Sequence, residues 1–207
     1  MKKIMGIFLV IILSVGCSSN VKKEATVKQL GFSEEQETLI NSITSAKVSK
    51  VRVNNLKELG AKEIEFGTAY QNTKDKKLIF EEKMGISDLN TTNPDYIELI
   101  STIKNRDGKI NGSIAYNVKG DNGQIQNSAK VEDDIKTIVN GTSTYTVAEY
   151  GNKNEPIKVE KGKKYLIGGV AANENGHING FTDDLTILNQ KKLEQWDSFY
   201  GIYFILK

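Results

Sequence analysis

Hydrophobic and polar residues alternate through much of this chain, which is typical of β-strands with one buried and one exposed face. The alternation is regular in KEIEFGTAY (62–70), KKLIFEEK (76–83) and SIAYNV (113–118). Residue pairs that favour tight turns separate many such segments, namely Asp107-Gly108, Asn111-Gly112, Asp121-Asn122 and Asn140-Gly141. Short strands joined by tight turns predict a mainly β fold, either a sandwich or a barrel, and of the two we expect a β-sandwich.

The run FYGIYFILK (199–207) at the end of the chain is strongly apolar and aromatic. At an exposed sheet edge such a strand would invite pairing with other chains. We therefore expect it to be a central strand with a neighbour on each side. Farther upstream, Gly168-Gly169 interrupts the strand-like segment 157–171, and this predicts a β-bulge or a tight bend.

One short helix is predicted near the N-terminal side, over about residues 33–44. Ser33 is followed three residues later by Gln36, which is the spacing of a capping box at a helix start. Leu39, Ile40 and Ile43 then follow at helical spacing.

Residues 93–103 (NPDYIELISTI) fit either a helix or a strand. Asn93 before Pro94 is typical of a helix start, and a helix would place Ile97, Ile100 and Ile103 on one face. The alternation expected of a strand is weaker here. Because turn signals follow immediately, we expect a strand.

The first sixteen residues differ in composition from everything that follows. Lys2 and Lys3 precede an apolar run from Ile4 to Val15, which is shorter than the ~20 residues that a membrane-spanning helix needs. This layout indicates a secretory signal peptide over residues 1–16.

Cys17 is the only cysteine, and it follows Leu13-Ser14-Val15-Gly16. The segment resembles the lipobox of bacterial lipoproteins, with Leu13 four residues before the cysteine where three is usual. The resemblance implies cleavage before Cys17, attachment of palmitate-type acyl chains, and a protein anchored at the extracytoplasmic face of a bacterial cell membrane. The alternatives are an ordinary signal peptide with an incidental cysteine, or an uncleaved anchoring helix.

Beyond Cys17, residues 17–31 are predicted to be a flexible, lipid-anchored tether, and residues 32–207 a single β-rich globular domain. Loss of Lys2 and Lys3 with the signal peptide leaves equal numbers of basic and acidic side chains. This balance gives no reason to expect nucleic-acid binding. Without a second cysteine, a disulfide within the chain and a thiolate zinc site are excluded.

Residues 96–150 resemble the small immunoglobulin-like domains of bacterial envelope lipoproteins. The resemblance rests on the segment 103–131, IKNRDGKINGSIAYNVKGDNGQIQNSAKV, with its strands and its turn at Asp121-Asn122-Gly123. It implies an immunoglobulin-like β-sandwich used for binding or spacing, with no catalytic residues to carry over.

No motif in the sequence specifies a cofactor, a metal or a catalytic residue. The repeated patterns DGKING (107–112) and NGHING (175–180) superficially match calcium loops, but apolar residues such as Ile103 and Ile114 occupy positions that must supply oxygen. His177 is the only histidine and is read as a solvent-facing loop residue. The adjacent acidic pairs, which would point to opposite faces of a strand, are Glu81-Glu82, Asp133-Asp134 and Asp183-Asp184.

Aromatic residues gather near the C-terminus, where Trp196, Phe199, Tyr200 and Tyr203 lie close to Asp197. This cluster is interpreted as a core strand with its preceding loop. Trp196 is expected to be its most exposed member and therefore a possible ligand contact, whereas Tyr203 and Phe204 are expected to be buried.

The preferred functional hypothesis is a non-catalytic, lipid-anchored binding or interaction module of the bacterial cell envelope. Its partner would be another envelope protein or a wall glycan, besides the membrane that holds its lipid. Two alternatives remain open, a carboxylate-dependent envelope hydrolase and a carrier of an apolar ligand. The hydrolase requires two carboxylates that converge in a pocket, and the carrier requires an apolar cavity of several hundred Å³.

Overall fold

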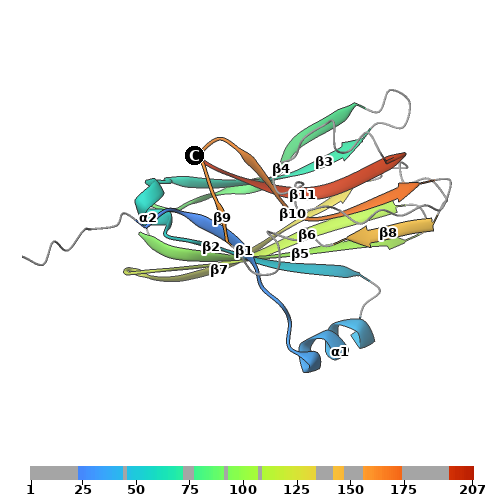
Figure 1. Ribbon diagram of the computed structural model, residues 1–207, viewed down its shortest axis with the longest axis horizontal. Coiled ribbons are helices and arrows are strands. Elements are labelled where there is room, and N and C mark those ends of the chain that lie inside the picture. The colour runs from blue at the N-terminus through green and yellow to red at the C-terminus, as the bar shows by residue number, and fades with distance from the viewer. Residues whose placement is uncertain are drawn as a thin grey trace, which may run out of the picture.

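The protein is a two-layer β-sandwich of antiparallel sheets (Figure 1). The computed structural model describes residues 23–43, 46–71, 77–90, 93–106, 109–133, 142–146, 156–173 and 196–207. The mainly β fold and the sandwich predicted from the alternation are thereby confirmed. The immunoglobulin-like resemblance stays a prediction.

The first sheet, which we name sheet A, contains six strands in the spatial order β7-β6-β5-β2-β1-β9. In chain order these are β1 (Thr26–Gln29), β2 (Lys47–Asn54), β5 (Pro94–Arg106), β6 (Lys109–Gly120), β7 (Gly123–Asp133) and β9 (Ile157–Lys158).

The second sheet, sheet B, has the order β4-β3-β11-β10-β8. Its strands are β3 (Glu63–Gln71), β4 (Leu78–Asp88), β8 (Thr142–Thr146), β10 (Lys164–Asn173) and β11 (Ser198–Leu206). As the C-terminal run predicted, β11 is a central strand between β3 and β10, and all nine of its residues are buried. Tyr203 and Phe204 are buried as expected.

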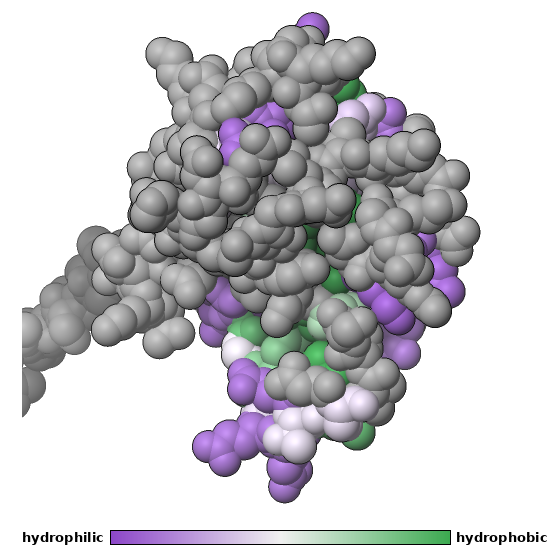
Figure 2. Space-filling model, turned by 90° about the vertical axis from the view of Figure 1, so that its right-hand side faces the viewer, coloured by the Kyte–Doolittle hydropathy of each residue, from purple (hydrophilic) through white to green (hydrophobic). Residues whose placement is uncertain are grey.

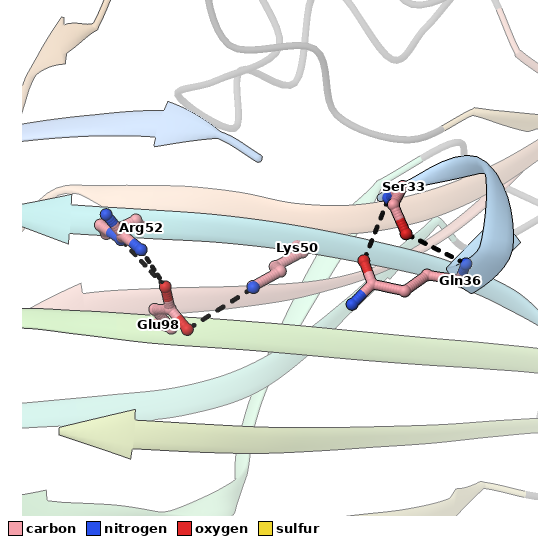
Figure 3. Close-up of polar contacts among 5 residues, drawn as sticks. All are labelled: Ser33, Gln36, Lys50, Arg52 and Glu98. Atoms are coloured by element: carbon pink, nitrogen blue, oxygen red, sulfur yellow. Dashed lines mark hydrogen bonds and ion pairs between the residues drawn. The ribbon is translucent and has the colours of Figure 1, made fainter. Parts of the chain in front are cut away.

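The predicted N-terminal helix is α1 (Glu34–Ile43), and its capping box forms as the sequence indicates. Ser33 and Gln36 exchange hydrogen bonds, 3.0 Å from the Ser33 amide to Gln36 Oε1 and 3.2 Å from the Gln36 amide to Ser33 Oγ (Figure 3). The expectation of a single helix is corrected by α2 (Leu56–Leu59), a single turn between left-handed residues Asn55 and Gly60. Four residues are too few to produce a helical period in the sequence.

The two sheets bury a continuous apolar core. Viewed from one end of the sandwich, the described apolar residues gather toward the middle and the hydrophilic residues lie at the margins (Figure 2). Small side chains let the sheets approach where β10 crosses β2 and β5. A Cβ on Gly168 would lie 2.6 Å from Ser101 Oγ, and Ser49 Oγ donates a 2.6 Å hydrogen bond to the Ile167 carbonyl. The predicted bulge at this place is confirmed by the register shift between Leu166 and Gly168.

The C-terminal part of the predicted tether is part of the fold. Residues 26–29 form β1, which pairs with β2 on one side and with β9 on the other. Val27 is completely buried. The strand is four residues long and mostly polar, so its place in the sheet depends on partners that lie far away in the sequence. Residues 17–22 of the predicted tether lie outside the described residues.

The structure also settles two predictions for the segments that form β5 and β6. Residues 94–106 form β5, which confirms the strand for this ambiguous segment. Asn111-Gly112 is not a turn but lies within β6. Gly112 makes room for the opposite sheet, because an added Cβ would lie 2.6 Å from Tyr200 Oη and the tyrosine would have to shift.

Candidate functional site

An open groove of about 570 Å³ lies on the outer face of sheet A, across β5, β6 and β7. This volume falls within the ~300–1,000 Å³ typical of ligand sites. Its lining combines polar and apolar surface and consists of Glu98, Ile100, Ala115, Tyr116, Asn117, Gln126, Asn127 and Ser128.

Strand register explains both the row of polar groups and the hollow. Glu98 pairs with Asn117, and Asn117 pairs with Gln126, so these side chains form one row across three strands. The next row along the strands contains Ile100, Ala115 and Ser128. Because the second row ends in two small side chains beside the longer side chains of the first, the surface is hollowed there.

The β6–β7 hairpin, which forms part of the groove, is held to α2 at one end by ion pairs. Lys57 Nζ lies 2.7 Å from Asp95 Oδ1 and 2.8 Å from Asp121 Oδ2, and Asn93 also donates a hydrogen bond to Asp121. Hydrogen bonds to Asp121 and then to Asp95 raise the pKa of Lys57. These contacts connect the turn between β6 and β7 to the first residues of β5.

Glu98 is the one carboxylate among the residues that line the groove. Arg52 on β2 donates to Glu98 Oε1 from Nε at 3.0 Å and also from its terminal nitrogen, while Lys50 Nζ lies 3.6 Å from Oε2 (Figure 3). Burial acts to raise the pKa of Glu98, but the Arg52 hydrogen bond and the charges of Lys50 and Arg52 together outweigh burial and lower it. The carboxylate is therefore ionised at neutral pH and largely neutralised by its neighbours.

Asn117 supplies an unused hydrogen-bonding atom to this lining. Its Oδ1 is buried and has no hydrogen-bond partner within the described part of the chain. Since the two ends of an amide are assigned from their partners, either the oxygen or the nitrogen of Asn117 can occupy this buried position. A buried polar atom without a partner costs about 1–3 kcal/mol, and a ligand in the groove reaches this atom only if the Asn117 side chain turns outward.

The hydrolase alternative needs a second carboxylate across a cleft, and the lining of this groove supplies only Glu98. The carrier alternative needs an enclosed apolar space. A second hollow, of about 240 Å³, lies where α2 meets β1 and β9 and is bordered by the charged residues Lys23, Glu24 and Lys158. Neither of these two hollows is an apolar cavity between the sheets.

Trp196 was expected to be exposed, and this expectation is wrong. Its side chain is 1% exposed and belongs to the apolar core, directly before β11. The hydrophilic residues around Trp196 in the sequence gave no indication of its burial, because the burial of this segment is set by the fold around β11. Trp196 is thus not a ligand contact at the surface.

The other residues singled out in the sequence do not assemble into a site within the described ranges. Ile110 is buried and Asn111 lies in β6, which does not fit a calcium loop. Glu81 accepts a 3.2 Å hydrogen bond from the Tyr70 hydroxyl. The described part of the chain holds no group of three or more His, Cys, Asp or Glu side chains suited to a metal ion. Outside the described residues lie Cys17, Asp107, Asp134, His177, Asp183 and Asp184.

Sequence reasoning missed the groove, although one signal was present. The turns predicted at Asp107-Gly108 and Asp121-Asn122 fix which residues face each other in the two hairpins. Arg106 pairs with Lys109 and Gly120 with Gly123, as two-residue turns require. Counting outward from both turns would have placed Glu98, Asn117 and Gln126 in one row.

The fold defines the class of the protein as an antiparallel β-sandwich with an open groove on one outer face. No protein-family model, curated protein or solved structure matches the chain. Within the ranges that the structure describes, no helix is long and apolar enough to cross a membrane.

Proposed function

We propose that this protein is a non-catalytic binding module of the bacterial cell envelope, anchored by lipid on Cys17 at the extracytoplasmic face of the membrane. The groove on sheet A contacts its partner, an envelope protein or a wall glycan. The observation that carries this proposal is the groove itself, because it presents amide, hydroxyl and carboxylate groups at an open surface. The core of the sandwich requires none of these groups.

The anchor is supported by the sequence of residues 1–17. An apolar run too short to span a bilayer ends at Gly16-Cys17, and a chain of mainly polar residues follows. Two or more acyl chains on one cysteine hold a protein stably at a membrane surface.

Metabolic labelling with an alkyne-bearing palmitate tests the anchor. The wild-type protein should become labelled and sediment with membranes, whereas Cys17→Ser should stay unlabelled. Equal labelling of the two proteins, or no label in the wild type, would refute the anchor.

Photo-crosslinking from the surface of intact cells tests the binding role. A photoreactive residue at Ser128, in the groove, should give a crosslinked product. The same residue at Gln124 is the matched control, because Gln124 is exposed on the same face of β7 but does not line the groove. Equal products from the two positions, or none from either, would contradict a binding role for the groove.

A further inference from the structure

We propose that the groove on sheet A binds an uncharged glycan, an inference that rests on the proposed binding role and names the ligand class of the same site. The lining carries hydrogen-bonding groups in a row, an aliphatic patch beside them, and almost no net charge. A neutral oligosaccharide has the complementary features, namely many hydroxyl groups, weakly apolar ring faces and no charge.

The hydrogen-bonding row consists of Glu98, Asn117 and Gln126. Each amide offers two N–H donors and an oxygen acceptor, and the carboxylate of Glu98 accepts only. Adjacent strands are ~4.8 Å apart, so the row presents mixed donors and acceptors at regular short intervals. Sugar hydroxyl groups both donate and accept, and can therefore pair with every member of this row. Asn117 lies in the middle of this row, between Glu98 and Gln126.

Beside this row lies an aliphatic patch formed by Ile100 and Ala115. Such a surface can pack against the C–H face of a sugar ring. Tyr116 does not serve as an aromatic platform here, because its ring stacks on Phe66 of sheet B with centroids 5.1 Å apart. The groove therefore depends on hydrogen bonds and aliphatic contact, and we expect its affinity for a short glycan to be modest.

Charge selects against other small ligands. No lysine or arginine is among the described residues that line the groove, so a phosphate or carboxylate group finds no cationic partner within it. At the same time Arg52 and Lys50 compensate the charge of Glu98 from the β2 side, so a cationic ligand gains little there. A ligand without charge avoids both costs.

A peptide is the less suitable occupant, although the groove is large enough for one. Extended peptides are bound mainly by hydrogen bonds to free backbone groups at a strand edge. The groove crosses the face of β5, β6 and β7, where the ladders between β5 and β6 and between β6 and β7 already pair the backbone. Side chains thus carry the recognition, as a hydroxyl-rich ligand requires.

The test is isothermal titration calorimetry of the full-length mature protein in detergent micelles. The probes are two neutral oligosaccharides, N-acetylchitotetraose and maltotetraose, with the cationic chitosan tetramer and an anionic oligogalacturonate as charged counterparts. At least one neutral probe should bind, and both charged probes should bind more weakly.

Variants locate the site. Gln126→Ala should weaken binding of the neutral probe about fivefold, the loss expected for one hydrogen bond, and Ser128→Phe should abolish binding by filling the hollow without adding a tryptophan. Gln124→Ala is the matched control, with the same residue type on the same strand and face, and should bind like the wild type. Unchanged Trp196 fluorescence shows that each variant is folded, because this single tryptophan is buried.

Equal or tighter binding of a charged probe, or neutral binding that survives both groove variants, would overturn the glycan inference. So would the absence of binding to either neutral probe. In that case, a protein partner crosslinked from Ser128 but not from Gln124 would leave the proposed binding role standing. The absence of any crosslinked product from Ser128 would refute the binding role as well.

Discussion

Gly168→Ala tests the close contact between the two sheets. Gly168 lies on the inner face of β10, and a Cβ at this position would be 2.6 Å from Ser101 Oγ and 3.2 Å from Ser49 Cβ. Such a contact with an oxygen atom is shorter than van der Waals packing allows, so Ser101 must adopt another rotamer or β10 and β5 must move apart. Movement of β5 would also disturb the groove, because Ile100 precedes Ser101 and faces outward into it.

Overpacking of a well-packed core typically costs about 1–3 kcal/mol, and we expect Gly168→Ala to lower the free energy of unfolding by this amount. Ser101→Ala removes the Oγ that clashes with the added Cβ of residue 168. The Cβ of residue 101 lies 3.8 Å from that added Cβ, which is an ordinary contact. The double variant should therefore recover part of the loss, with a coupling energy of about 0.5–3 kcal/mol. Recovery should be incomplete because Ser49 Cβ remains close.

The assay is urea unfolding followed by the fluorescence of Trp196, which is buried in the native protein. With an m-value of about 1–3 kcal/mol per molar urea, the expected loss lowers the midpoint by roughly 1 M. Gly31→Ala is the control, since nothing lies within 4 Å of a Cβ there. A Gly168→Ala midpoint equal to that of the wild type, or no recovery on adding Ser101→Ala, would refute the packing argument.

Two further predictions concern charge and helix capping. The pKa of Glu98 lies below its ordinary 4.5 in the folded protein, so this group's contribution to stability is present above about pH 4.5 and is lost as the pH falls through the lowered pKa. Arg52→Gln should raise the pKa of Glu98 and reduce this acid-dependent fall in the urea midpoint; parallel pH profiles for the two proteins would contradict the assignment. Ser33→Ala removes the oxygen that caps the Gln36 amide, and loss of a cap typically costs about 1 kcal/mol of local helix stability. Hydrogen exchange should speed up in α1 but not in β11, and unchanged exchange in α1 would show that the capping box does not hold this helix.

Local patterns were sufficient to predict much of the fold. Alternation identified β6, because a strand with one buried face must repeat every two residues. It also identified β3, but the exposed face expected for that strand is wrong, because both of its faces are buried. The capping box at Ser33 identified the start of α1, since its hydrogen bonds join residues three apart. The apolar run of β11 indicated a central strand for a similar reason, because both of its faces and both of its edges needed cover.

Where a residue's role depended on distant partners, local patterns misled. Gly112 was interpreted as part of a turn, yet it makes room for Tyr200, which lies far along the chain in β11. Trp196 has hydrophilic neighbours in the sequence but packs in the core. The polar segment of β1 carries little strand signal and is held by β2 and β9.

The sequence by itself thus determined that the chain forms alternating strands and where most of them turn, because these properties depend on residues close together along the chain. Only the tertiary structure decided which strands pair, which polar side chains share a row on sheet A, and which aromatic residues are covered. The groove belongs to this second group. Its depth comes from small side chains, Ala115 and Ser128, that adjoin the row of Glu98, Asn117 and Gln126 only after β5, β6 and β7 have paired in register.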